Sequence, residues 1–166
     1  MDNEALRRAL GCFATGVCII TCRSEDGTLT GMTANSFNSV SLDPPLILFS
    51  VRRSAGSAAA FTTADGFAVN VLSQSQKTRA QHVARGSADQ WWGVSHRTWL
   101  TGAPIIDDAL ANFDCRVASV HEGGDHWIIL GRVLKWEFTP ERTPLLFFQG
   151  KYGAMADGRF FGQVHN

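Results

Sequence analysis

The feature that most limits the fold is a succession of short apolar runs separated by tight turns. The runs at 17–22, 46–51 and 66–72 have the length and the β-branched content of strands. Ser24-Glu25-Asp26-Gly27 supplies hairpin-turn chemistry after the first of them. Because most strands follow one another without an intervening helix, the pattern favours an antiparallel barrel over a parallel sheet with alternating helices.

A pass along the chain predicts six to eight strands and a few short helices, so we expect a mainly β fold in a single domain of 166 residues. The first helix carries Leu6, Leu10 and Phe13 on one face, and Gly16 is expected to stop it. Residues 86–104 are expected to be irregular. The predicted helices are 4–14, 56–64, 74–85 and a helical turn at 105–110; the predicted strands are 17–23, a run from Leu29 through Ser36, 37–42, 46–52, 66–72, 115–121, 126–138 and 144–149.

Charge and composition exclude several partner classes. The formal net charge is +0, and no basic block or acidic tail occurs, so nucleic acid and anionic membranes are poor candidates. No apolar run approaches the roughly 20 residues of a membrane span, and the N-terminus lacks a signal-peptide core. Hydrophobic residues make up 45% of the chain and charged residues only 18%, which favours a homodimer that hides part of its surface.

The four cysteines do not form a metal or redox motif. Cys12, Cys18, Cys22 and Cys115 contain no Cys-x-x-Cys pair. Cys18 and Cys22 share a strand face with Ile20 and are predicted to be small core residues. A reduced, cytoplasmic protein follows. His121 and His126 lack a third ligand at a suitable spacing, so no metal site is expected.

One polar segment stands out between the apolar strands. Gly31-Met32-Thr33-Ala34-Asn35-Ser36-Phe37 presents hydroxyls, an amide and backbone N–H groups in fixed directions. Such a row suits a flat polar ligand with a phosphate tail. The alternative is a polar hairpin without a ligand, since Ser, Thr and Asn are common turn residues.

Several motifs, in this order and spacing, resemble the flavin reductase family of two-component monooxygenases, whose members are similar to FMN-binding split-barrel proteins. The resemblance spans residues 4–153. The motifs are Ala14-Thr15-Gly16-Val17, the 31–37 segment, Ser41-Leu42-Asp43-Pro44-Pro45-Leu46, Phe67-Ala68-Val69-Asn70-Val71-Leu72, Gly124-Asp125-His126 and Phe148-Gln149-Gly150-Lys151-Tyr152.

The resemblance implies an antiparallel FMN-binding split β-barrel of Greek-key type, and a homodimer that reduces FMN or FAD with NADH or NADPH. It implies that the reduced flavin passes to a partner oxygenase. The residues it assigns to the isoalloxazine and ribityl chain are Thr33, Ala34, Asn35 and Ser36, with Ser50, Val51 and Arg52 beside them; to the flavin phosphate, Ser54 and Ser57; to the nicotinamide cofactor, Gly124, Asp125 and His126, with Tyr152 near the same pocket.

The sequence departs from the family pattern at two places. The family often has a Phe-Ala pair where this chain has His82-Val83-Ala84, and Arg85 follows as a contact to phosphate or adenine. Gln149-Gly150-Lys151 replaces a more frequent Arg-Gly-Arg, which bears on the choice between NADH and NADPH. Arg52 is expected to contact phosphate, whereas Arg53 is expected to be solvated.

Hydride transfer from nicotinamide C4 to flavin N5 needs little acid–base help, which explains the absence of a catalytic triad or Rossmann glycine pattern. His126 is the candidate catalytic residue, and it is expected to position the nicotinamide; a turn histidine paired with Asp125 is the alternative. Trp91, Trp92 and Trp99 suit core or dimer packing, or a lid over the nicotinamide site.

Two other functions compete with the reductase. A non-enzymatic flavin-binding electron carrier has the same barrel, but the Gly124-Asp125-His126 motif argues against it. A protein that handles heme or pyridoxal phosphate on this barrel requires a heme-ligating histidine or a more basic phosphate site, and the neutral chain shows neither clearly.

Overall fold

The chain folds around one strongly curved antiparallel sheet. The computed structural model describes residues 2–86, 91 and 93–155. Its helices are α1 (Asn3–Leu10), α2 (Ala58–Thr63), the 3₁₀ turn η1 (Gln74–Gln76) and α3 (Lys77–Ala84). Its strands are β1 (Thr15–Gly16), β2 (Cys18–Arg23), β3 (Leu29–Ala34), β4 (Asn38–Leu42), β5 (Pro45–Arg52), β6 (Gly66–Val71), β7 (His96–Thr98), β8 (Pro104–Ile106), β9 (Ala111–Gly123), β10 (His126–Phe138), β11 (Leu146–Phe148) and β12 (Lys151–Gly153).

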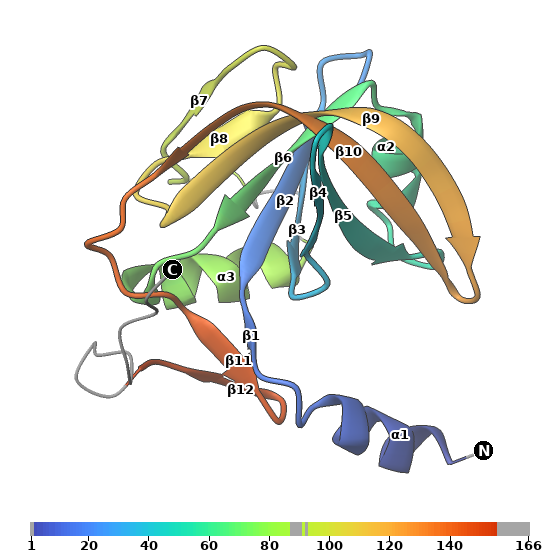
Figure 1. The fold of residues 1–166 in the computed structure, drawn as a ribbon, viewed down its shortest axis with the longest axis vertical. Coiled ribbons are helices and arrows are strands. Elements are labelled where there is room, and N and C mark those ends of the chain that lie inside the picture. Colours follow the sequence, from blue (N-terminus) through green and yellow to red (C-terminus); the bar gives the residue numbers. More distant parts are fainter. Residues whose placement is uncertain (1, 87–90, 92, 156–166) are drawn as a thin grey trace.

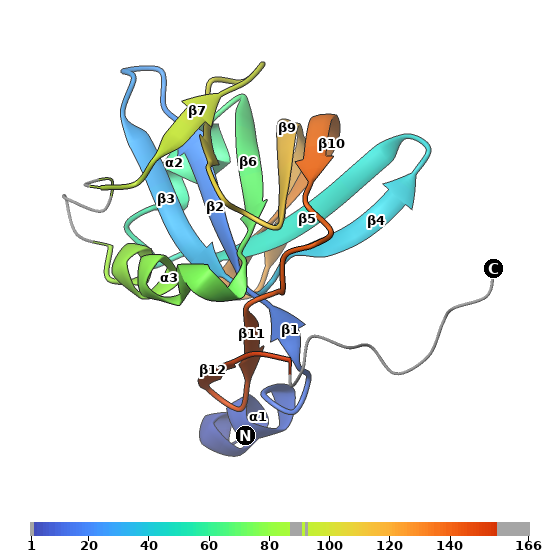
Figure 2. The same ribbon diagram turned by 90° about the vertical axis from the view of Figure 1, so that its left-hand side faces the viewer.

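The main sheet has the strand order β3-β2-β6-β9-β10-β5-β4 (Figure 2). Its two edge strands, β3 and β4, are consecutive in the sequence and are joined by residues 35–37 alone. Because so short a connection has to reach from one edge to the other, the sheet curves until the end of β3 comes close to the start of β4. In the described chain these edges do not pair with each other, so the barrel stays open at this connection.

The core fills the inside of the curved sheet. Phe49, Phe61 and Phe67 pack edge to face at its centre, with ring centroids 4.9–5.4 Å apart. Cys18 and Cys22 lie beside Ile20 in the same buried cluster, which confirms their prediction as core residues. Burial raises the pKa of both thiols to about 12, because an apolar surrounding disfavours the thiolate.

A second buried cluster lies on the other face of β2, where α3 covers it (Figure 1). Val17 and Ile19 from the β2 region meet Ala80 and Val83 of α3 there. The contact places the last turn of α3 next to β3. None of the helices among the described residues is long and apolar enough to cross a membrane.

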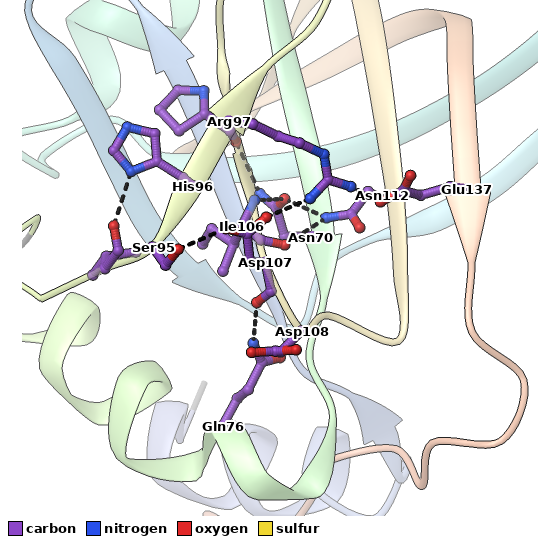
Figure 3. Close-up of polar contacts among 12 residues, drawn as sticks. Asn70, Gln76, Ser95, His96, Arg97, Ile106, Asp107, Asp108, Asn112 and Glu137 are labelled. Atoms are coloured by element: carbon purple, nitrogen blue, oxygen red, sulfur yellow. Dashed lines mark hydrogen bonds and ion pairs between the residues drawn. The ribbon is translucent and has the colours of Figure 1, made fainter.

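The prediction of a helical turn at 105–110 is wrong over its first residues. Pro104–Ile106 forms β8, which pairs with β7, a strand that the sequence did not predict. The Ile106 N–H donates to Asn70 Oδ1 (2.8 Å), and Asn112 Nδ2 donates to the Ile106 carbonyl oxygen (3.1 Å). These buried amides occupy the backbone groups that a helical turn would use. Figure 3 shows them together with Asp107, which Ser95 and Arg97 contact just beyond the strand.

Short strands also raise the strand number above the predicted six to eight, to twelve in the described residues. β1, β11 and β12 form a separate three-stranded sheet below the barrel (Figure 1). Gln149 and Gly150 join β11 to β12 with positive φ angles of 47° and 77°, as a tight hairpin turn requires. The first helix is shorter than predicted, since it ends at Leu10.

Candidate functional site

A cavity of about 780 Å³ lies at the open edge of the barrel. The end of β3 and the 35–36 connection form one wall, the end of β5 and the start of α2 form another, and the end of α3 and His126 of β10 close the sides. Its lining residues are Thr30, Gly31, Met32, Thr33, Ala34, Asn35, Ser36, Ser50, Val51, Arg52, Ala55, Gly56, Ser57, Val83, Ala84, Arg85, Gly86 and His126. The structure therefore brings the predicted segments 33–36 and 50–52 together.

Two hydroxyls of the polar segment hold the walls of the cavity in place. Thr33 Oγ1 donates to the carbonyl oxygen of Ala80 in α3 (2.7 Å). Ser36 Oγ donates to the Ser50 carbonyl oxygen (2.9 Å) and accepts from the Ser50 N–H (3.0 Å). Both hydroxyl protons are thus used inside the protein, which leaves the backbone N–H groups and the Asn35 amide as donors toward a ligand. The exposed Asn35 amide has no hydrogen bond to another described residue.

The charge of the cavity lining suits an anion. Arg52 and Arg85 line it with exposed guanidinium groups, and none of the described lining residues carries a carboxylate. Ala55, Gly56 and Ser57 form the approach to α2, and the Ser57 hydroxyl makes no capping hydrogen bond within that helix. Positive charge, backbone N–H groups and an available hydroxyl are the groups that bind phosphate in proteins.

The β9–β10 hairpin presents His126 to this cavity. His126 pairs with Arg52 in the sheet register, and its Nδ1 lies 2.7 Å from Asp125 Oδ1. The hydrogen bond from His126, assisted by the charge of Arg52, lowers the pKa of the Asp125 carboxyl below its usual range. Since an ionised carboxylate only accepts, Nδ1 carries the proton, and Nε2 is the nitrogen left for a ligand.

Four of the predicted site residues do not line the cavity. Ser54 stands between the lining residues of β5 and α2, and Gly124 and Asp125 form the hairpin turn behind His126. Tyr152 lies on β12, where its ring packs against Phe147 (centroids 5.4 Å apart), and burial raises the pKa of its phenol. These four therefore act on the cavity of this chain, if at all, through their neighbours.

Two of the three tryptophans that suggested a lid have packing contacts in the structure. Trp91 Nε1 donates to the Leu29 carbonyl oxygen (2.8 Å), and its ring packs against the cluster under α3. Trp99 packs near Ala103 and Ile105, with Arg97 and Lys135 over its ring. Both contacts agree with the packing alternative. Trp92 lies outside the described residues.

Some lining residues were not among the predicted cofactor contacts. Val83, Ala84 and Gly86 line the cavity because α3 ends beside β3. Met32 joins them from the apolar side of the 31–37 segment. Only the amphipathic pattern of α3, with Ala80 and Val83 buried, could have indicated which end of that helix approaches the barrel.

A larger depression, of about 1110 Å³, lies between η1, α3 and residues 141–143. Three of its charged groups already have partners: Arg142 Nη2 donates to Asp108 Oδ1 (2.9 Å), and Arg79 Nη1 donates to the Asp107 carbonyl oxygen (3.1 Å). None of the sequence motifs converges on it. The smaller cavity at the barrel edge is therefore the candidate site.

Comparison with known proteins identifies the family. A family model described as "Flavin reductase like domain" matches residues 10–156. The chain belongs to the flavin reductase family. A protein named "Flavin reductase" from Pseudomonas putida is 40% identical over 156 residues, which are 94% of this chain and 92% of that protein.

Two solved structures show the same fold. Nitrilotriacetate monooxygenase component B from Mycobacterium thermoresistibile has a TM-score of 0.92 at 37% identity, covering 99% of this chain and 93% of the other. The NADH:FAD oxidoreductase SgcE6 from Streptomyces globisporus, solved with NAD and FAD fragments, has a TM-score of 0.89 at 40% identity, covering 94% of each chain. The flavin reductase fold of this chain is thus the antiparallel split barrel that the sequence predicted.

Proposed function

We propose that this protein reduces FMN or FAD with NADH or NADPH in the cavity at the barrel edge. The observation that carries the proposal is the meeting of the polar 33–36 segment, a cationic end and His126 around one cavity. A volume of about 780 Å³ lies within the roughly 300–1,000 Å³ of small-molecule sites. We propose residues 1–166 as one functional domain.

The lining residues fit a flavin nucleotide. The backbone of Thr33–Ser36 and the Asn35 amide are available to a polar ring edge, and Ser50 and Val51 line the adjoining wall, which Ser36 contacts. We assign Arg52, Arg85 and Ser57 to the phosphate, because they supply charge and a hydroxyl donor to the cavity, and we assign Ser54 to the same group as their neighbour in the sequence. When both nucleotides are bound, the chemistry they supply is transfer of a hydride from nicotinamide C4 to flavin N5.

His126 is the residue that we assign to the nicotinamide. Asp125 fixes the tautomer and the direction of its ring, so Nε2 is held ready to bond with a carboxamide or a phosphate oxygen. Gly124, at φ 69°, allows the turn that precedes the pair. Tyr152 belongs to the nicotinamide pocket only if a second copy of the chain brings it there.

The reduced flavin serves a partner monooxygenase, as the name of the nitrilotriacetate component implies for that relative. We propose a homodimer in the cytoplasm. The dimer is supported by large apolar side chains left at the surface of a single chain: Leu42 is 95% exposed, Phe138 67% and Trp136 60%.

Anaerobic absorbance at the oxidised-flavin band tests the activity directly. The purified protein is mixed with FMN or FAD, and NADH or NADPH is added to each. Rapid loss of the band with one pair establishes the reductase and its preferred nucleotides. Bound flavin that none of the four combinations bleaches contradicts the proposal and favours an electron carrier.

A further inference from the structure

Arg53 follows the cavity-lining Arg52 directly, and the proposed function gives it no role. Its side chain does not line the cavity. Instead, the guanidinium carbon lies 4.1 Å from the centroid of the Trp127 ring, and Nη2 lies 2.8 Å from Glu122 Oε1. The side chain is 38% exposed, so Arg53 lies at the surface as the sequence predicted, but its guanidinium also has two protein partners there.

The sheet register explains where this contact lies relative to His126. Val51, Trp127 and Glu122 form one row across β5, β10 and β9, and Arg52, His126 and Gly123 form the next row. Side chains of adjacent rows point to opposite faces of a sheet. Arg53 follows Val51 by two positions, so its side chain lies on the same face of the sheet as Val51 and Trp127. His126 lies on the other face, where it lines the cavity.

The backbone adds a third link between the same segments. The Arg53 N–H donates to the carbonyl oxygen of Asp125 at 2.9 Å. Arg53 therefore contacts the tip of the hairpin at three points: Asp125 in the turn, Trp127 at the start of β10 and Glu122 at the end of β9. We propose that Arg53 is a positioning residue that holds the β9–β10 hairpin tip against the cavity and so sets the place of Asp125 and His126. This inference rests on the proposed function of His126.

The chemistry of the contact requires arginine. A planar guanidinium stacks on an indole face and donates to a carboxylate in its own plane at the same time. The compact ammonium of lysine makes one of these contacts well but not both. A lysine at this position therefore preserves the charge and loses part of the positioning.

The test uses Arg53→Ala and Arg53→Lys in the full chain loaded with flavin. We expect R53A to raise the Kd for NAD⁺, or for NADP⁺ where the wild-type protein oxidises NADPH, by about tenfold in calorimetry, with R53K in between. The Kd for flavin, measured by quenching of its fluorescence, changes by less than about twofold. Hydrogen exchange of peptide amides at residues 121–128 becomes faster in R53A even without any nucleotide.

Arg97→Ala is the matched control. Arg97 also lies over a tryptophan ring, that of Trp99, and pairs with Asp107 and Glu137, but it is not among the residues that line the cavity. R97A is expected to leave the Kd for NAD⁺ and the exchange of the hairpin unchanged.

Three results overturn the inference: an unchanged Kd for NAD⁺ in R53A, an equal effect of R97A, or a flavin Kd that rises as much as that for NAD⁺, which would make Arg53 a flavin contact. Failure of the proposed function looks different, because the wild-type protein then binds neither NAD⁺ nor NADP⁺ and oxidises neither NADH nor NADPH. In that case, hydrogen exchange of the amides at residues 121–128 still tests whether Arg53 holds the hairpin tip.

Discussion

Replacing Ser36 with alanine separates two roles that the polar segment of the cavity combines. The substitution removes both hydrogen bonds to the Ser50 backbone, of 2.9 and 3.0 Å, and leaves an N–H and a carbonyl of β5 without this partner. A hydrogen bond contributes about 0.5–1.5 kcal/mol net. Because the site is only partly buried, water replaces some of the loss, so we expect the free energy of unfolding to fall by about 2 kcal/mol.

Asn35→Ala is expected to behave in the opposite way. Its exposed amide makes no hydrogen bond to another described residue, so the free energy of unfolding changes by no more than about 0.5 kcal/mol. The amide faces the cavity, and losing one ligand hydrogen bond raises the flavin Kd roughly three- to tenfold. Ser36→Ala is therefore expected to lower the free energy of unfolding, and Asn35→Ala to raise the flavin Kd.

Urea unfolding followed by tryptophan fluorescence measures the first quantity, and flavin fluorescence titration measures the second. Unfolding is measured without flavin, because a bound ligand adds its own stabilisation. Ser39→Ala is the control: Ser39 is an exposed serine of β4, and no hydrogen bond of its side chain to another described residue is found. A Ser36→Ala protein that unfolds at the wild-type urea midpoint with the same slope refutes the role of the Ser36–Ser50 contact.

His126→Ala removes the ring that Asp125 orients, and steady-state kinetics should show a KM for NAD(P)H raised about tenfold or more, with little change for flavin. Gly131→Ala puts a Cβ into the Phe67 ring, and urea unfolding should show a loss of about 1–3 kcal/mol or more. Alkaline pH should also weaken the fold. The pKa values of Cys18 and Cys22 are raised to about 12 in the folded state, so their stabilisation is complete below the unfolded pKa near 9 and is lost as pH rises toward 12; unfolding at pH 8.5 and 10.5 measures a loss of at most about 1.4 kcal/mol per thiol per pH unit.

Each of these results has a control and a contrary outcome. His121, which bonds to Ser119 on the same hairpin, supplies the matched histidine variant, and equal effects of His126→Ala on both KM values remove the nicotinamide role. A wild-type urea midpoint in Gly131→Ala means that the core repacks without strain. Cys18→Val should flatten the alkaline decline, and an unchanged slope contradicts the assignment to the buried thiols.

The long strands of the barrel were predictable because their burial pattern is reflected in the order of apolar and polar residues in the sequence. β5 alternates between buried and partly buried residues along Leu46–Val51, and β2 is buried on both faces, since Ile20 faces the barrel and Ile19 faces α3. Both patterns read as strands from residue types alone. The same argument identified the core cysteines.

The short strands were not predictable, because they form only through contacts with other parts of the folded chain. β8 depends on Asn70, which lies 36 residues away in the sequence, and on Asn112, six residues away; both amides bond to the backbone of Ile106. Pro104 at its first position is tolerated in a strand but does not indicate one. β12 exists because β11 lies beside it, and three residues carry too little periodicity to be recognised.

The candidate site was predicted where it is contiguous and missed where helix packing builds it. Thr33, Asn35 and Ser36 carry polar side chains between apolar strands, so their segment stood out, whereas residues 50–52 were assigned through the family resemblance. Val83 and Ala84 are ordinary helix residues that line the cavity through the placement of α3. The hydroxyl of Thr33 looked like a ligand donor, but its bond to Ala80 depends on that same placement.

The alternation across β5, β10 and β9 makes the length of the hairpin tip as important as its chemistry. Gly123, Gly124 and Asp125 set the row in which each later residue of β10 falls. Deleting one of them shifts β10 by one position against β5, and the indole of Trp127 then takes the place of the imidazole at the cavity, while His126 enters the core. Insertions and deletions at this tip are therefore far less tolerable than substitutions, and a library that varies the site should keep its length fixed.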